Sequence, residues 1–198
     1  MIITAFLSVL SVVLYIVYRT EPRKDSMLAM LLSSVGDVLI VNSASIGQLA
    51  TYFGAAAFIA AHIIYGECFR KQIKKADGKY FNSLFYSGAV IMAASAVIIG
   101  ILAFTKPEEK KPVMFVLILF YIAAIGYNVC SSFSLAKVKG GLFRILPVAA
   151  LVFYLTDIFI FEDMLNIDHG MRQYVWLIYP EAQLCLVLFN SKLSVARK

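Results

Sequence analysis

Charged side chains are scarce in this chain. They make up 15% of the residues, whereas 61% are apolar; soluble domains average about 25% charged and about 45–50% apolar. The charges gather between long apolar stretches, which is the distribution that a hydrocarbon solvent requires. The net charge of +6 comes mainly from Lys and Arg at the ends of those stretches. Because no basic patch is interleaved with aromatics, we do not expect nucleic-acid binding.

Metal-binding and nucleophilic motifs are also missing. The three cysteines, Cys68, Cys130 and Cys185, form no CxxC pair and have no histidine at zinc-ligand spacing, so a structural zinc site or a disulfide framework is not expected. The chain contains no GxSxG, HExxH, Walker or GxGxxG motif. These absences argue against nucleophile-elbow hydrolases, zincins, P-loop proteins and dinucleotide-binding proteins. We expect neither a metal nor a cofactor.

The N-terminal segment lacks the marks of a cleaved signal peptide. Residues 1–18 contain no basic residue before the apolar run and no A-x-A-like site followed by a soluble mature chain. We therefore expect a retained first membrane span.

Seven apolar stretches of about 20 residues predict a polytopic bundle of transmembrane helices, since each is close to the length that crosses the hydrocarbon. Helices are expected because lipid cannot satisfy open backbone groups, and the alternating ten-residue segments of a membrane barrel are absent. We expect one domain, residues 1–198. The stretches cover 2–18, 26–41, 46–68, 82–104, 113–133, 142–161 and 173–189.

Positive charge is unequally divided between the two sides that seven crossings define. Fourteen of the 18 Lys and Arg fall on one side, in segments 19–25, 70–81 and 137–144 and at the C-terminus. The positive-inside rule then places the N-terminus outside and the C-terminus in the cytoplasm. Splitting or merging a span would remove this asymmetry, so the distribution favours seven spans. We expect an integral multi-pass protein of a bacterial inner membrane.

Four ionisable residues lie well inside the predicted spans: Asp37, His62, Asp157 and Glu181; Glu67 is nearer the end of its span. A charge at mid-bilayer costs at least about 2.5 kcal/mol, so such residues are functional candidates. Asp37 and Asp157 each come late in an outward-running span and should lie at similar depth. His62 comes late in an inward-running span and should lie about 10 Å deeper than Asp37, so we expect no contact between them. Two carboxylic acids at one depth suit acid–base catalysis, because close carboxyls tend to share one proton.

Each candidate also has a structural explanation. The two aspartates could serve as hydrogen-bonding partners of neighbouring helices, and His62 could be a packed histidine with its nitrogens satisfied. Pro180, before Glu181, disturbs the last helix and could admit water. Tyrosines inside spans are more often core or interfacial aromatics than site residues.

Four short motifs follow one another along the chain. The sequence LSSVGDVL, at 32–39, precedes a helix with Gly54, Phe58, His62 and Tyr65 at fixed spacing. LVFYLTDIFIFEDML, at 151–165, is followed by IYPEAQLCLVL at 178–188. Together they resemble the YhhN-type lysoplasmalogenase family, with Thr156 in place of the usual serine and with Tyr179, Ala182 and Gln183 matching the last motif. The resemblance covers 32 to the C-terminus. The family usually has eight helices, one more than predicted here before the Gly-Asp helix.

This resemblance implies a membrane enzyme without cofactor that hydrolyses the vinyl-ether bond of lysoplasmalogens, releasing a fatty aldehyde and a glycerophospho-base. Its partners would be the bilayer and a membrane lipid or lysophospholipid substrate. It implies Asp37 and Asp157 as the catalytic pair. Supporting or substrate-binding roles would fall to Ser34, His62, Tyr65, Thr156, Tyr179, Glu181 and Gln183.

Two other functions stay open from the sequence. Intramembrane carboxylates also serve proton-coupled transport, so a small transporter or a lipid-binding membrane protein is the main alternative. No inverted repeat or clearly broken helix pair supports transport. The second alternative is another lipid hydrolase acting on amide or ester bonds, although such enzymes often hold a metal with several histidines, and this chain has two.

Overall fold

The fold of the described residues is entirely helical. The computed structural model describes residues 2–76, 88, 112–164 and 172–190, and this part of the chain contains no strand. The α-helical class expected from the apolar stretches is therefore confirmed. The elements are α1 (Ile2–Tyr18), α2 (Glu21–Val41), α3 (Ser43–Ile46), α4 (Gln48–Ala76), α6 (Pro112–Lys139), the 3-10 turn η3 (Gly141–Arg144), α7 (Ile145–Met164) and α8 (Arg172–Phe189).

Several helices extend beyond the apolar stretches that predicted them. Helix α2 begins at Glu21, five residues before the predicted span 26–41, and α4 continues to Ala76, eight residues past the predicted end at Cys68. Pro22 is tolerated because it lies in the first turn of α2. Lys and Arg are good helix formers, so a charged segment does not stop a helix. Hydropathy marks where a bilayer would end, not where a helix ends.

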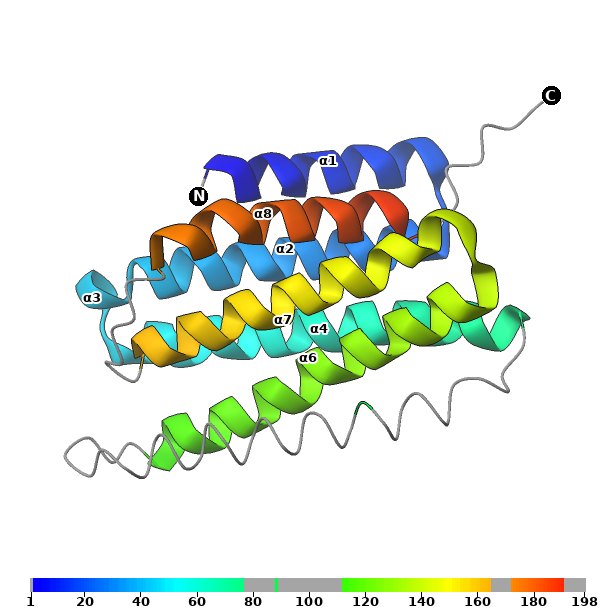
Figure 1. Ribbon diagram of the computed structural model, residues 1–198. Helices are drawn as coiled ribbons and strands as arrows, with labels where there is room; N and C mark the ends of the chain where they lie inside the picture. Colours follow the sequence, from blue (N-terminus) through cyan, green and yellow to red (C-terminus); the bar gives the residue numbers. More distant parts are fainter. Residues whose placement is uncertain (1, 77–87, 89–111, 165–171, 191–198) are drawn as a thin grey trace.

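One predicted span cannot be compared. The stretch 82–104 lies outside the described residues apart from Gly88. Helix α4 ends and α6 begins at opposite ends of the bundle (Figure 1).

The long helices lie side by side as a bundle (Figure 1). Helix α2 packs against α1 and α4, α4 packs against α6, and α7 packs against both α6 and α8. Helix α8 also contacts α1 and α2, which closes the arrangement. Residues far apart in the sequence therefore meet along the inside of α2, α4, α7 and α8.

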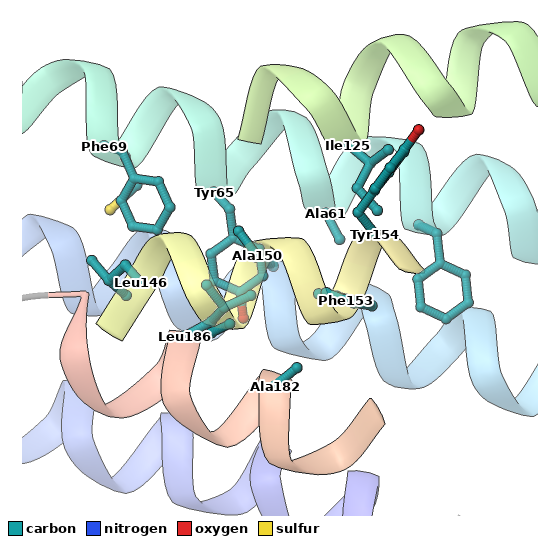
Figure 2. Close-up of a cluster of buried hydrophobic side chains, with 14 of the residues drawn as sticks. Ala61, Tyr65, Phe69, Ile125, Leu146, Ala150, Phe153, Tyr154, Ala182 and Leu186 are labelled. Carbon is teal, nitrogen blue, oxygen red and sulfur yellow. The ribbon is translucent and has the colours of Figure 1, made fainter. Parts of the chain in front are cut away.

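The apolar core lies mainly between α4, α6, α7 and α8. Figure 2 shows Phe153 and Ala150 of α7 lying among side chains from the neighbouring helices. Helix α1 contributes Leu7 to a separate small cluster, which Met30 of α2 and Val187 of α8 complete. The largest buried apolar side chains of the main core are Tyr65, Tyr179, Phe58, Phe69, Phe153, Ile73, Ile118, Ile125 and Leu135.

The bundle is apolar outside and carries polar groups inside. Phe53, Phe120 and Leu177 are 65%, 64% and 68% exposed, whereas Asp37 and Asp157 are buried. Soluble monomers rarely expose apolar surface on this scale. In the described part of the chain, two helical segments, Gln48–Ala76 and Val116–Lys139, are long and apolar enough to cross a bilayer. Ile3–Tyr18 and Leu177–Phe189 are shorter apolar helices.

Two glycines allow α2 and α4 to approach closely. A Cβ atom at Gly36 would lie 2.6 Å from the Phe58 ring, and one at Gly54 would lie 2.7 Å from Ile40 and 3.1 Å from the Gly36 carbonyl oxygen. Small residues at helix contacts bring backbones together in membranes, where packing and not hydrophobicity drives association. This contact sets where Asp37 stands relative to α4.

Helix α8 is anchored at its C-terminus by a buried arginine. The Arg23 guanidinium, 1% exposed, donates to the carbonyl oxygens of Val187 and Leu188, the latter at 3.0 Å. Asn190 Nδ2 donates to the Pro22 carbonyl oxygen at 2.7 Å. The last carbonyls of a helix have no partner within it, and a cation there also meets the negative end of the helix dipole. Arg23 therefore joins α2 to α8.

We expect Gly54→Leu to lower the thermal unfolding midpoint in detergent, because the added side chain overpacks the α2–α4 contact by about 1–3 kcal/mol. Ala56→Leu is the matched control, since Ala56 is exposed on the same helix. Equal midpoints for the two variants would contradict the close approach.

We expect Arg23→Met to destabilise the bundle by about 2–4 kcal/mol, because two carbonyls at the end of α8 lose charged donors. Lys24→Met removes the same charge from an exposed neighbour and should leave the unfolding midpoint nearly unchanged. The measurement is thermal unfolding of both proteins in one detergent. An Arg23→Met protein as stable as wild type would show that the anchor is dispensable.

Candidate active site

Asp157 stands on the inner face of α7 and is 2% exposed. Its Oδ2 atom accepts a hydrogen bond of 2.9 Å from the Tyr121 hydroxyl of α6. Its Oδ1 atom has no partner among the described residues. One carboxylate oxygen is therefore held by the protein while the other is available to a ligand or water.

His62 of α4 contacts the same oxygen. Its Nε2 atom lies 3.3 Å from Asp157 Oδ2, a contact whose alignment is poorer than that of a regular hydrogen bond. Its Nδ1 atom lies 3.2 Å from Asn128 Nδ2 of α6. The ring packs against Phe153 and Tyr121, with centroids 4.7 and 5.5 Å apart. Both the position and the tilt of the imidazole are therefore fixed by neighbouring helices.

Asp37 reaches the site from α2 and is 3% exposed. Hydroxyl groups of Tyr179 on α8 and Thr4 on α1 hydrogen-bond to its carboxylate. The Tyr179 hydroxyl in turn accepts a 2.6 Å bond from Gln183 Nε2. Asp37 Oδ2 has no partner among the described residues. Like Asp157, Asp37 has one oxygen held by the protein and one available.

The two aspartates belong to one site. Tyr179, which bonds to Asp37, packs against Phe153 of the Asp157 helix with ring centroids 4.9 Å apart. Aromatic rings line the space around them: Phe58 lies 6.2 Å from Tyr121 and 6.3 Å from Tyr179, centroid to centroid. In such apolar surroundings, hydrogen bonds and charges interact more strongly than in water. The arrangement offers two carboxyl groups, two phenols and an imidazole for proton transfer.

The partner of His62 was not predicted from the sequence. Helix α4 runs from Gln48 to Ala76, so His62 lies near its middle, where it contacts Asp157 of α7. The expected difference of about 10 Å in depth between His62 and Asp37 stays a prediction.

Four other candidate residues lie away from the carboxyl groups. Ser34 faces α1, where its hydroxyl bonds with Ser8 Oγ at 2.5 Å. The Thr156 hydroxyl donates to the Phe153 carbonyl of its own helix at 2.8 Å. Tyr65 is fully buried and stacks on Phe69. Glu181 is exposed on α8, so the acidic residue after Pro180 does not enter this cluster.

Sequence reasoning did not select three residues that bond to the candidate site: Tyr121, Asn128 and Thr4. Tyr121 and Asn128 are seven residues apart and lie on one face of α6. Asn128 could have been identified from the sequence, because an amide inside an apolar stretch needs a hydrogen-bonding partner within the protein. Tyr121 and Thr4 gave no such signal, since tyrosine and threonine are common in membrane helices.

No group of three or more His, Cys, Asp or Glu side chains in the described part of the chain is placed to hold a metal ion.

Comparison with known proteins identifies a family. Neither the curated proteins nor the solved structures include a significant match to this chain. The model of the YhhN family matches residues 1–190, which extends the resemblance seen from residue 32 to the start of the chain and includes α1. The chain therefore belongs to the YhhN family.

Proposed function

We propose that this chain hydrolyses the vinyl-ether bond of lysoplasmalogen-type lipids to a fatty aldehyde and a glycerophospho-base. The observation that carries the proposal is the placement of Asp37 and Asp157 around one set of buried aromatic rings, where each carboxyl group has one oxygen without a partner among the described residues. Membership of the YhhN family agrees with a hydrolase.

The chemistry needs one proton donor and one proton acceptor. A carboxylic acid transfers its proton to the vinyl carbon remote from the ether oxygen, and the other carbon becomes an oxocarbenium ion. Water adds to that carbon while the carboxylate of the pair takes a proton from the water. As the resulting hemiacetal collapses to an aldehyde and an alcohol, the first carboxyl group takes the hydroxyl proton and the second returns its proton to the departing oxygen. The overall reaction consumes one water, and each carboxyl group regains its starting protonation.

Surrounding groups support these steps. A carboxylate close to the oxocarbenium carbon stabilises its positive charge, most strongly where water is excluded. Tyr121 holds one oxygen of Asp157 and Tyr179 bonds to Asp37, which leaves the other oxygen of each carboxyl group for substrate or water. The apolar outer faces of the helices suit a substrate that arrives from the bilayer.

We expect Asp37→Asn and Asp157→Asn each to reduce aldehyde release by about 100-fold or more, because an amide can neither donate nor accept the required proton. The assay is aldehyde formation from a lysoplasmalogen in detergent micelles. Glu21→Gln, an exposed change at the start of α2, should keep the wild-type rate. Full activity in either aspartate variant would contradict the proposed mechanism.

We further propose that the protein crosses the membrane seven times with its C-terminus in the cytoplasm. Figure 1 shows that the end of α1, the start of α2, the ends of α4 and α6 and the start of α7 lie at one end of the bundle. That end carries ten of the eleven Lys and Arg residues in the described part of the chain, whereas Arg172 starts α8 at the other end. The positive-inside rule assigns the basic end to the cytoplasm.

A reporter-fusion experiment tests this orientation in a bacterial host. Alkaline phosphatase, which is active only outside the cytoplasm, should be inactive when fused to the C-terminus and active when fused after Asn42. Green fluorescent protein should give the opposite pattern. Phosphatase activity at the C-terminal junction would reverse the orientation or change the span count.

A further inference from the structure

Asn128 is a buried amide that contacts the imidazole and not the carboxylates. It lies on α6, is fully buried, and places Nδ2 3.2 Å from Nδ1 of His62. The Nδ2 group of an asparagine is a donor, so the ring nitrogen opposite must present its lone pair. The proton of a neutral His62 then lies on Nε2.

The Nε2–H group lies beside Asp157, without the alignment of a regular hydrogen bond. Nε2 is 3.3 Å from Oδ2, the oxygen that also accepts the Tyr121 hydroxyl at 2.9 Å. Donors that converge on one oxygen favour the ionised carboxylate. With the other tautomer, the Nε2 lone pair would face that oxygen, an arrangement that is favourable only if Asp157 carries a proton. In the described part of the chain, the His62 ring contacts the side chains of Asn128, Tyr121, Phe153 and Asp157.

We propose that Asn128 is a positioning residue that holds the proton of His62 on Nε2 and thereby keeps Asp157 as the carboxylate of the pair. Two interacting carboxyl groups tend to hold a single proton, so that proton belongs to Asp37. Asp37 is then the acid that protonates the vinyl ether, and Asp157 stabilises the cation and accepts the proton of water. This division of roles rests on the proposed hydrolase function, whereas the tautomer does not.

The tautomer can be read directly by NMR. The chain has two histidines, so ¹⁵N-histidine labelling of a His169→Gln protein in detergent leaves His62 as the only imidazole signal. We expect a non-protonated Nδ1 and a protonated Nε2. Asn128→Asp replaces the donor by an acceptor of the same shape and should move the proton to Nδ1. A proton on Nδ1 in the starting protein, or an unchanged tautomer in Asn128→Asp, would overturn the proposal.

Asn190→Asp is the matched control, because Asn190 is equally buried but bonds to the Pro22 carbonyl near the α8 anchor. It should leave the His62 tautomer unchanged. If the Asn128→Asp bundle does not assemble, Asn128→Leu serves instead, and the loss of the donor should yield a mixture of tautomers. A pure Nε2–H signal in Asn128→Leu would also overturn the proposal.

Kinetics then separate the tautomer from the roles of the aspartates. We expect kcat for aldehyde release to fall by about 100-fold in Asn128→Asp, with KM little changed, since the proton-transfer step and not lipid binding is affected. A reversed tautomer with an unchanged kcat would overturn the division of roles. If the wild-type protein released no aldehyde, the proposed function would fail while the NMR result still decided the tautomer.

Discussion

The interior of this bundle is governed by one constraint: a polar group removed from water must find its partner inside the protein. The outer faces of the helices are apolar, so polar side chains gather inward and meet one another. Asp157, His62 and Asn128 come from three helices and form one continuous series of contacts. An enzyme that needs buried acids benefits from the same constraint, because the partners that make burial tolerable also orient the reactive atoms.

The constraint acts differently at the two levels of the bundle. At the basic end, the buried Arg23 donates to the terminal carbonyls of α8 and joins two helices, although its Nε atom has no partner among the described residues. At the level of the aspartates, the unpartnered atoms include carboxylate oxygens, since Asp37 and Asp157 each retain an oxygen without a partner in the described structure. Unsatisfied buried oxygens are costly, and such groups are characteristic of sites that bind water or substrate.

Sequence reasoning found the two aspartates because a carboxyl group inside an apolar stretch stands out whatever its surroundings. It did not predict the contact of His62 with Asp157, because the rotation of α4 relative to α7 leaves no local signal in the sequence. It chose Ser34 from a motif, but the turn of α2 directs that side chain toward Ser8 of α1. Tyr121 was passed over, since a tyrosine in a span has many structural uses.

The sequence by itself determined the helical class, the family, the unequal distribution of positive charge and the acidic pair, because each depends on composition or local order along the chain. Only the tertiary structure decided which groups meet: that His62 contacts Asp157, that Asn128 faces Nδ1, and that Glu181 points away. These contacts depend on the rotation and the axial offset of helices joined by distant parts of the chain. A close approach at Gly36 and Gly54 sets that offset for α2 and α4, and no local pattern encodes its result.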